Sequence, residues 1–280
     1  MVCWTCVAVW LAVGSVIAYF FFSKKNKKQV GIRKHDWKPD IVYLYQFPRI
    51  KSVPNLSPYC LKVETFLKAN KIPYEVCTLL MGRSKYGLLP FIELNGEHIA
   101  DSQIILHRLK THFKVKPLPS PKDEALARTI ERTTENHTAP VIFKFKIVES
   151  SGNDYVMEMI PSLGLPQAFT PILAPLTSCM IKRAVSKRVA TSIGNFSDED
   201  FKQLLRKDLD TYRDLLAGKK FFFGDEITSA DCTLFSQLAT TIYIPVDNYA
   251  KNVIQDEYPE LVTFCDNIRD KIFGKEFTQE

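Results

Sequence analysis

The sequence predicts an α/β domain followed by an all-helical domain, with one transmembrane helix in front of them. Three observations predict this fold class. An uncharged apolar run opens the 280-residue chain, strand and helix patterns alternate over residues 41–114, and only helical patterns follow a proline-rich stretch. The composition, 46% hydrophobic and 24% charged, is globular and excludes disorder or low complexity for the chain as a whole.

Charge and cysteine content exclude two functional classes. The 37 basic and 31 acidic residues leave a net charge of +6, too mild an excess to indicate nucleic-acid binding. Seven cysteines without framework spacing argue against a secreted disulfide scaffold and for a reducing compartment. Cys3 and Cys6 form a C-x-x-C, but no second ligand pair completes a metal site, so we interpret them as membrane-packing residues.

Residues 1–23 are predicted to be a transmembrane signal anchor. No charge occurs over 2–22, and at about 1.5 Å per residue this run spans roughly 31 Å, close to a hydrocarbon core. Four lysines follow at once in a basic linker, 24–40, whereas a signal peptide carries its charge before the apolar run. We therefore expect an uncleaved anchor with the body facing the cytoplasm, and a cleaved leader as the alternative. The organelle stays open among lysosome, outer mitochondrial membrane and endoplasmic reticulum.

The first domain, 41–114, shows strand periodicity, turn residues and helix caps in a regular order. Ser57 is typical of an N-cap, and Pro58 of a first helical position. The expected elements are a strand over 41–47, a helix from Ser57-Pro58 to Asn70, a strand over 74–80, a hairpin over 91–100 turning at Asn95-Gly96, and a helix capped by Asp101.

The second domain, 122–275, is predicted to be all helical. Three prolines within 114–121 mark the linker before it. The uncharged stretch 159–181 is long enough to span a membrane but holds four prolines, so we favour a buried, broken helical insertion over a second span. The other expected helices cover 123–147 (interrupted by Pro140), 197–218, 228–244 and 259–273.

Three motifs resemble the glutathione S-transferase superfamily over about residues 41–275. The run 57–63 (SPYCLKV) looks like the first helix start of a thioredoxin-like domain. The run 88–94 (LLPFIEL) resembles the cis-proline strand, and Asp101-Ser102 follows at the expected place. FFGD at 222–225 with TSAD at 228–231 resembles the helix-start motif of the all-helical domain, where Thr228 and Asp231 form a capping box.

Two short runs point to one branch of the superfamily. The residues QFPR at 46–49, followed by LSPYCLK at 56–62, are most similar to the failed-axon-connections and metaxin-like branch. The anchor and the scattered cysteines look like the nematode cadmium-responsive proteins of that branch. The resemblance implies glutathione as substrate, conjugation to electrophiles, a stress or cadmium response, and a homodimer or other protein partners. The alternative that it leaves open is a non-catalytic interaction module at a membrane. No His, Cys or carboxylate spacing indicates a metal site.

The resemblance implies that Ser57 activates the thiol of glutathione. A helix N-terminus lowers the pKa of a thiolate placed there, and a donated hydroxyl hydrogen bond lowers it further. The alternative role of Ser57 is a plain N-cap. Because Ser57 replaces the first cysteine of a glutaredoxin-like C-P-Y-C, we do not expect thiol–disulfide exchange from Cys60. Tyr45 is the fallback activator, although a core aromatic is the simpler role.

The remaining site residues are also implied by the resemblance. Leu89-Pro90 would be a cis peptide whose Leu89 backbone binds the cysteine of glutathione. Asp101 and Ser102 would bind the γ-glutamyl end, with helix capping as their alternative role.

Tyr59 is assigned to the same site, and with Tyr86 it would border the pocket for the second substrate. Arg83 and Lys85 would hold the glycine carboxylate. The loop that carries them is short, so the helix usually found there is expected to shrink to a turn.

Overall fold

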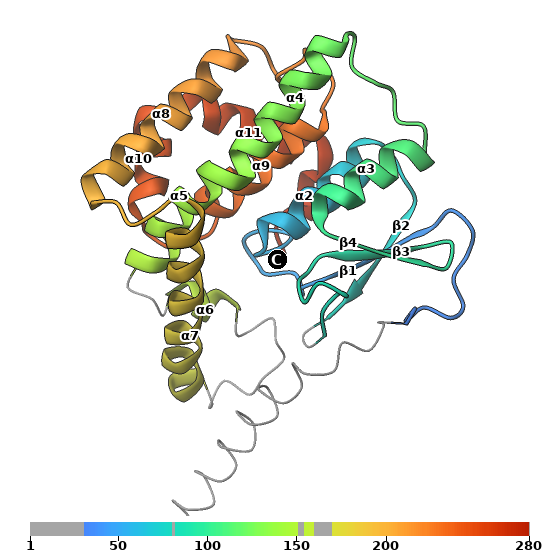
Figure 1. Cartoon of the computed structure of the whole chain (residues 1–280), viewed down its shortest axis with the longest axis horizontal. Coiled ribbons are helices and arrows are strands. Elements are labelled where there is room, and N and C mark those ends of the chain that lie inside the picture. Colours follow the sequence, from blue (N-terminus) through green and yellow to red (C-terminus); the bar gives the residue numbers. More distant parts are fainter. Residues whose placement is uncertain (1–30, 80–81, 151–153, 160–169, 280) are drawn as a thin grey trace, which may run out of the picture.

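The computed structural model confirms an α/β unit followed by a helical unit (Figure 1). It describes residues 31–79, 82–150, 154–159 and 170–279. The α/β unit comprises β1 (Val42–Gln46), α2 (Pro58–Ala69), β2 (Tyr74–Thr78), β3 (Phe91–Leu94), β4 (Glu97–Ala100) and α3 (Ser102–His112). The helical unit comprises α4 (Pro121–Thr133), α5 (Ala139–Phe143), α6 (Asp154–Met159), α7 (Thr170–Ser192), α8 (Asp198–Leu216), α9 (Ser229–Ile242), α10 (Tyr249–Glu257) and α11 (Pro259–Ile272). The predicted domain boundaries themselves stay a prediction.

The four strands form one mixed sheet in the order β2-β1-β3-β4. β1 runs parallel to β2 and antiparallel to β3, which pairs with β4 through the predicted hairpin. Asn95 and Gly96 have φ values of 49° and 79°. A two-residue hairpin turn with both φ values positive is of the type that Asn-Gly favours, because Asn tolerates and Gly freely adopts this backbone conformation.

The two faces of the sheet are covered by different parts of the chain. α2 and α3 lie above the sheet in Figure 1, and Val42 and Leu44 of β1 pack with them in one buried cluster. On the other face, the carboxylate of Glu93 accepts hydrogen bonds from the backbone N–H groups of Arg33 and Lys34, at 2.8 and 2.9 Å. The segment before β1 therefore covers this face, and the described residues of the loop between β2 and β3 form no helix.

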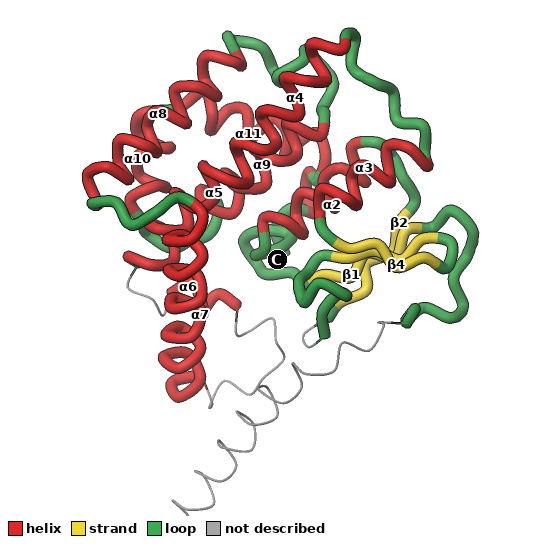
Figure 2. Tube along the Cα trace, viewed as in Figure 1, coloured by secondary structure: helices red, strands yellow, loops and turns green. Residues whose placement is uncertain are grey.

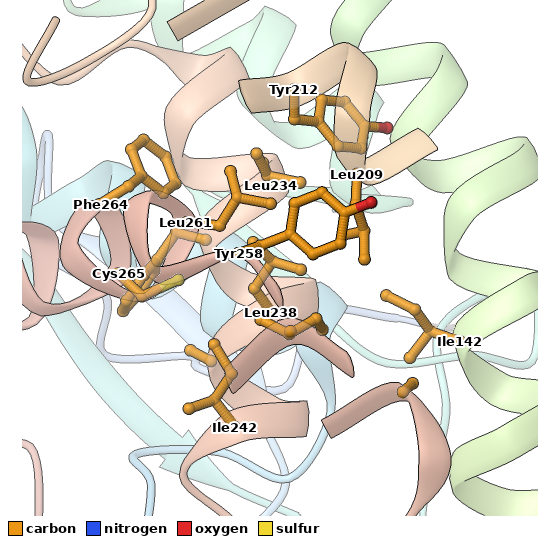
Figure 3. Close-up of a cluster of buried hydrophobic side chains, with 14 of the residues drawn as sticks. Ile142, Leu209, Tyr212, Leu234, Leu238, Ile242, Tyr258, Leu261, Phe264 and Cys265 are labelled. Atoms are coloured by element: carbon orange, nitrogen blue, oxygen red, sulfur yellow. The ribbon is translucent and has the colours of Figure 1, made fainter. Parts of the chain in front are cut away.

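The helical unit surrounds α9, all fourteen residues of which are buried. Figure 3 shows Leu234, Leu238 and Ile242 of this helix among side chains from its neighbours. A helix buried on every side must satisfy its polar side chains internally, and the hydroxyls of Thr233 and Thr241 donate to backbone carbonyls of their own helix. α4, α10 and α11 lie against this helix (Figure 2), and α2 packs against it from the α/β unit.

Three helical segments differ from the sequence expectation. Pro140 does not interrupt its helix: it is the second residue of α5 (Ala139–Phe143) and follows the π-helical turn Thr134–Thr138, so it lies in the first turn, where proline is tolerated. The stretch 159–181 is not simply buried: α7 continues through Pro175, and Leu176 and Met180 are exposed. Residues 160–169 lie outside the described residues. The short helix α10 was not predicted.

The prediction of a single-pass membrane protein is wrong for the described part of the chain. None of its helices is long and apolar enough to cross a membrane. The segment 2–22, on which that prediction rested, lies outside the described residues, and so does the C-x-x-C at Cys3–Cys6 within it.

Candidate functional site

A cavity of about 360 Å³ opens where the α/β unit meets the helical unit. Its volume falls within the range of about 300–1,000 Å³ that is common for small-molecule sites. It is lined by residues from α2, the β2–β3 loop, the start of α3, α4 with the turn after it, and α7. They are Tyr59, Ser84, Tyr86, Leu88, Leu89, Pro90, Asp101, Ser102, Ile104, Arg132, Glu135, Asn136 and Arg188.

The cavity brings together five of the eight residues assigned to the site from the sequence. These are Tyr59, Leu89, Pro90, Asp101 and Ser102. The Leu89-Pro90 peptide is cis, as the motif implied. Ser57, Arg83 and Lys85 are not among the lining residues.

Asp101 lines the cavity and also caps a helix. Its carboxylate accepts hydrogen bonds from the backbone N–H groups of Gln103 and Ile104, at 3.0 and 3.2 Å, and so caps α3. Its backbone is strained, with φ 78° and ψ 127°. Strained backbone at a non-glycine residue is held in place by surrounding contacts and often occurs at functional sites.

Ser57 occupies the N-cap position of α2, but its side chain makes no capping hydrogen bond. The hydroxyl instead interacts with Cys60, which is fully buried. Burial raises the pKa of the Cys60 thiol to about 12, and the hydrogen bond from Ser57 opposes that rise. Cys60 therefore stays a thiol at neutral pH, which agrees with the expectation that it performs no thiol–disulfide exchange.

Three other candidate side chains do not line the cavity and contact aromatic rings or a buried carboxylate instead. The Arg83 guanidinium lies 5.4 Å from the centre of the Phe47 ring, and the Lys85 ammonium lies 5.3 Å from that of Tyr86. The buried Tyr45 hydroxyl donates to Glu93 at 2.9 Å, and burial raises the pKa of Tyr45. Tyr45 is therefore a core aromatic of the sheet.

Glu135 lines the cavity and was not predicted from the sequence. It lies in the π-helical turn after α4, and its carboxylate pairs with the buried Lys62 ammonium at 2.5 Å and with the Arg132 guanidinium at 3.1 Å. The Ser102 hydroxyl is 3.5 Å from the same carboxylate. Helical spacing accounts only for the Arg132–Glu135 pair, three residues apart. It gives no sign of Lys62 and Ser102, which come from α2 and α3 and meet this carboxylate only in the folded chain.

Arg188 is the second unpredicted residue. It lies on α7, and its Nη2 donates a hydrogen bond of 3.2 Å to the Tyr59 hydroxyl on α2. The guanidinium carbon is 5.5 Å from the Tyr59 ring centre. Burial raises the pKa of Tyr59, and the nearby Arg188 charge opposes the rise, so Tyr59 is a neutral phenol at neutral pH.

The described residues offer no metal centre. No group of three or more His, Cys, Asp or Glu side chains among them could hold a metal ion. The polar lining of the cavity instead supplies cations, carboxylates, hydroxyls and backbone groups, which are suited to a zwitterionic organic ligand.

Comparisons with known proteins place these features in a family. A model of the glutathione S-transferase N-terminal domain matches residues 58–152, and one of the C-terminal domain matches 205–268. Failed axon connections of Drosophila melanogaster is 34% identical over 258 residues, which cover 88% of this chain and 61% of that protein. The isoprene-epoxide glutathione S-transferase of Rhodococcus sp. is 26% identical over 238 residues, 82% of this chain and 98% of that protein.

Solved structures show the same fold at lower sequence identity. A glutathione S-transferase from the Antarctic clam Laternula elliptica has a TM-score of 0.54 at 15% identity, covering 85% of this chain and 92% of that one. A Methylobacterium radiotolerans glutathione S-transferase in complex with glutathione sulfonate has a TM-score of 0.53 at 17% identity, covering 86% and 97%. The two domain matches, in their expected order and together covering more than half of the chain, show that it belongs to the glutathione S-transferase superfamily.

Proposed function

We propose that this chain binds glutathione in the cavity between its two units and conjugates it to electrophiles. The observation that carries the proposal is the composition of the cavity. Leu89 and Pro90 lie beside the N-terminus of α3, while the Arg132 and Arg188 guanidiniums and the Glu135 carboxylate line the same space. Glutathione carries two carboxylates and one ammonium, so it needs charges of both signs, and a helix N-terminus favours a carboxylate.

Ser57 remains the proposed thiol activator. Its hydroxyl is not used as an N-cap, which leaves the first N–H groups of α2 without that side-chain acceptor. A thiolate close to this helix end would benefit from those N–H groups and from the helix dipole.

A non-catalytic interaction module is the less favoured function, because a relative that this chain covers almost entirely is named as a glutathione S-transferase. Homodimerisation and a role in cadmium response are further predictions from the resemblance. Neither is needed for the proposed chemistry.

Calorimetric titration of glutathione into the full chain tests the proposal. We expect binding that weakens by about tenfold or less in Ser102→Ala, because one neutral hydrogen bond is worth ~1 kcal/mol. Ser186→Ala, on the exposed surface of α7, is the matched control and should bind like the unmodified chain. Absence of binding at millimolar glutathione would refute the proposal.

The thiol-activating role of Ser57 needs a separate measurement. The ultraviolet absorbance of the bound thiolate, followed against pH, reports the pKa of the bound thiol. We expect that pKa to be lower in the unmodified chain than in Ser57→Ala. Equal values in the two proteins would remove Ser57 from the mechanism and leave glutathione binding intact.

A further inference from the structure

A groove of about 890 Å³ runs along one face of α7, the helix that extends away from the core of the helical unit in Figure 1. Its lining residues on α7 recur at intervals of three and four, which places them on one side of the helix. Val148 and Asn195 complete the lining. The residues from α7 are Pro175, Ser178, Cys179, Lys182, Arg183, Ser186, Lys187 and Ala190.

The positive charge of this groove has no acidic counterpart in its lining. Lys182, Arg183 and Lys187 line the groove, and no aspartate or glutamate does. Within the part of the chain that the structure describes, none of these three cations forms an ion pair, whereas Arg206 of α8 pairs with Glu257 at its surface. Unpaired charges of one sign around a concave surface raise the local concentration of oppositely charged ligands.

Lys182 is held in place without being neutralised. Its ammonium donates a hydrogen bond of 2.6 Å to the backbone carbonyl of Ser150, which uses one of its three N–H donors and leaves its charge unpaired. Lys187 lies five residues further, about 7.5 Å along the helix axis, and Arg183 lies next to Lys182. A guanidinium binds two oxygens of a phosphate at once, and an ammonium binds as a point charge.

We propose that this groove binds a small organic anion that carries two or more phosphate groups. Two phosphate groups bring about three to four negative charges near neutral pH, enough for three unpaired cations, whereas one carboxylate leaves most of the positive charge unbalanced. The Ser186 hydroxyl and the Asn195 amide add hydrogen-bond donors, and Val148, Pro175 and Ala190 offer apolar surface for the organic part. The site does not depend on the proposed function, because it shares no lining residue with the glutathione cavity.

Calorimetric titration of inorganic pyrophosphate into the full chain at low salt tests the charge requirement. We expect Arg183→Gln and Lys187→Gln each to weaken binding by about tenfold, because each removes a hydrogen bond to a charged group. Both side chains are exposed, so neither change should affect folding. Lys207→Gln removes the same charge from an exposed position on α8 and should change the affinity by no more than about twofold, since distant surface charges are screened.

The thiol of Cys179 reports where pyrophosphate binds. Cys179 is exposed and lines the groove beside the three cations. Saturating pyrophosphate should slow its alkylation by iodoacetamide, whereas sodium chloride at the same ionic strength should not. Peptide mass spectrometry measures the rate. Unchanged alkylation of Cys179 while pyrophosphate is bound would place the anion elsewhere and refute the proposal.

A soluble organic phosphate and a phospholipid headgroup would present the same chemistry to this groove. Sedimentation of the chain with phosphatidylcholine vesicles, with and without phosphatidylinositol bisphosphate, distinguishes the two sources. Binding of pyrophosphate without binding to either vesicle supports a soluble ligand. Binding only to the bisphosphate vesicles, lost in Arg183→Gln, supports a headgroup. The proposal is overturned if neither pyrophosphate nor these vesicles bind, or if Lys207→Gln weakens binding as much as Arg183→Gln does.

Discussion

At the scale of single residues, burial decides which titratable groups of this chain are available for chemistry. Lys146 is 1% exposed, and no described residue offers its ammonium a hydrogen-bond partner. Its ammonium nitrogen lies 5.1 Å from the centre of the Tyr155 ring. Burial lowers the pKa of Lys146 from 10.5 to about 7, so the folded chain holds it largely neutral under mildly alkaline conditions.

Lys146 should therefore make folding stability depend on pH. Between pH 7 and 10.5 the unfolded chain binds a proton at Lys146 that the folded chain does not, so the free energy of unfolding rises with pH across this window. Lys146→Met should raise that free energy by about 1–4 kcal/mol at pH 7, as replacing buried charged groups can, and flatten the rise. Urea unfolding at pH 7, 8 and 9 measures both effects. The control Lys122→Met, on an exposed part of α4, should not change how the free energy of unfolding rises with pH. If Lys146→Met left that rise unchanged, the prediction would be contradicted.

Burial should also decide which cysteines of the folded chain react. Cys179 is exposed, whereas Cys60, Cys232 and Cys265 are buried and burial raises the pKa of each buried thiol. Because the thiolate is the reactive form, brief treatment of the folded chain with iodoacetamide at pH 8 should label Cys179 and spare the other three. Peptide mass spectrometry reads the pattern, and labelling in urea serves as the control. Rapid labelling of Cys60 in the folded chain would reopen a redox role for it.

At the scale of elements, two capping boxes start α8 and α9 but differ in burial. In the exposed box of α8, Ser197 and Asp200 bond each other's backbone N–H groups. In the box of α9, the fully buried Asp231 carboxylate accepts from the backbone N–H groups of Phe222 and Thr228, at 2.9 and 2.8 Å. Asp231 thus fixes the preceding turn as well as the helix.

Asp231→Ala should consequently cost more than Asp200→Ala. Asp231→Ala leaves two N–H groups without their acceptor, at least one of them buried, and should lower the free energy of unfolding by about 2–4 kcal/mol. Asp200→Ala removes an exposed cap and should lower it by about 1 kcal/mol. Denaturant unfolding of both variants at one pH measures the difference. Equal losses would show that Asp231 acts only as a helix cap.

The elements were largely predictable from the sequence, because their signals are local. The Asn95-Gly96 turn, the caps at Asp101 and Thr228, and the apolar faces of the helices each depend on neighbouring residues. The partners in the candidate site were less predictable. Glu135 meets Lys62 across 73 residues and Arg188 meets Tyr59 across 129, and neither pair leaves a periodic or motif signal.

At the scale of the whole molecule, a buried polar cluster spans the contact between the two units. Lys62 belongs to α2, and its ammonium has its carboxylate partner in the helical unit, at Glu135. The side chains are 1% and 7% exposed, so neither charge is solvated by bulk water. A buried ion pair contributes little compared with an apolar pair, yet removing one partner leaves the other charge buried and unpaired. The two units also meet where α2 packs against α9, and Lys110 of α3 donates a hydrogen bond of 2.6 Å to the Ser229 hydroxyl of α9.

Glu135→Ala should therefore destabilise the chain by about 3–5 kcal/mol, the cost of leaving the Lys62 ammonium buried without its carboxylate. Glu97→Ala is the matched control, because its partner Arg108 and Glu97 itself are both about half exposed, and such a pair is worth about 0–1 kcal/mol. Urea unfolding followed by circular dichroism gives both values. The double variant Lys62→Met with Glu135→Ala removes both charges and should recover much of the loss. If Glu135→Ala cost no more than Glu97→Ala, the buried pair would not contribute measurably to the contact between the two units.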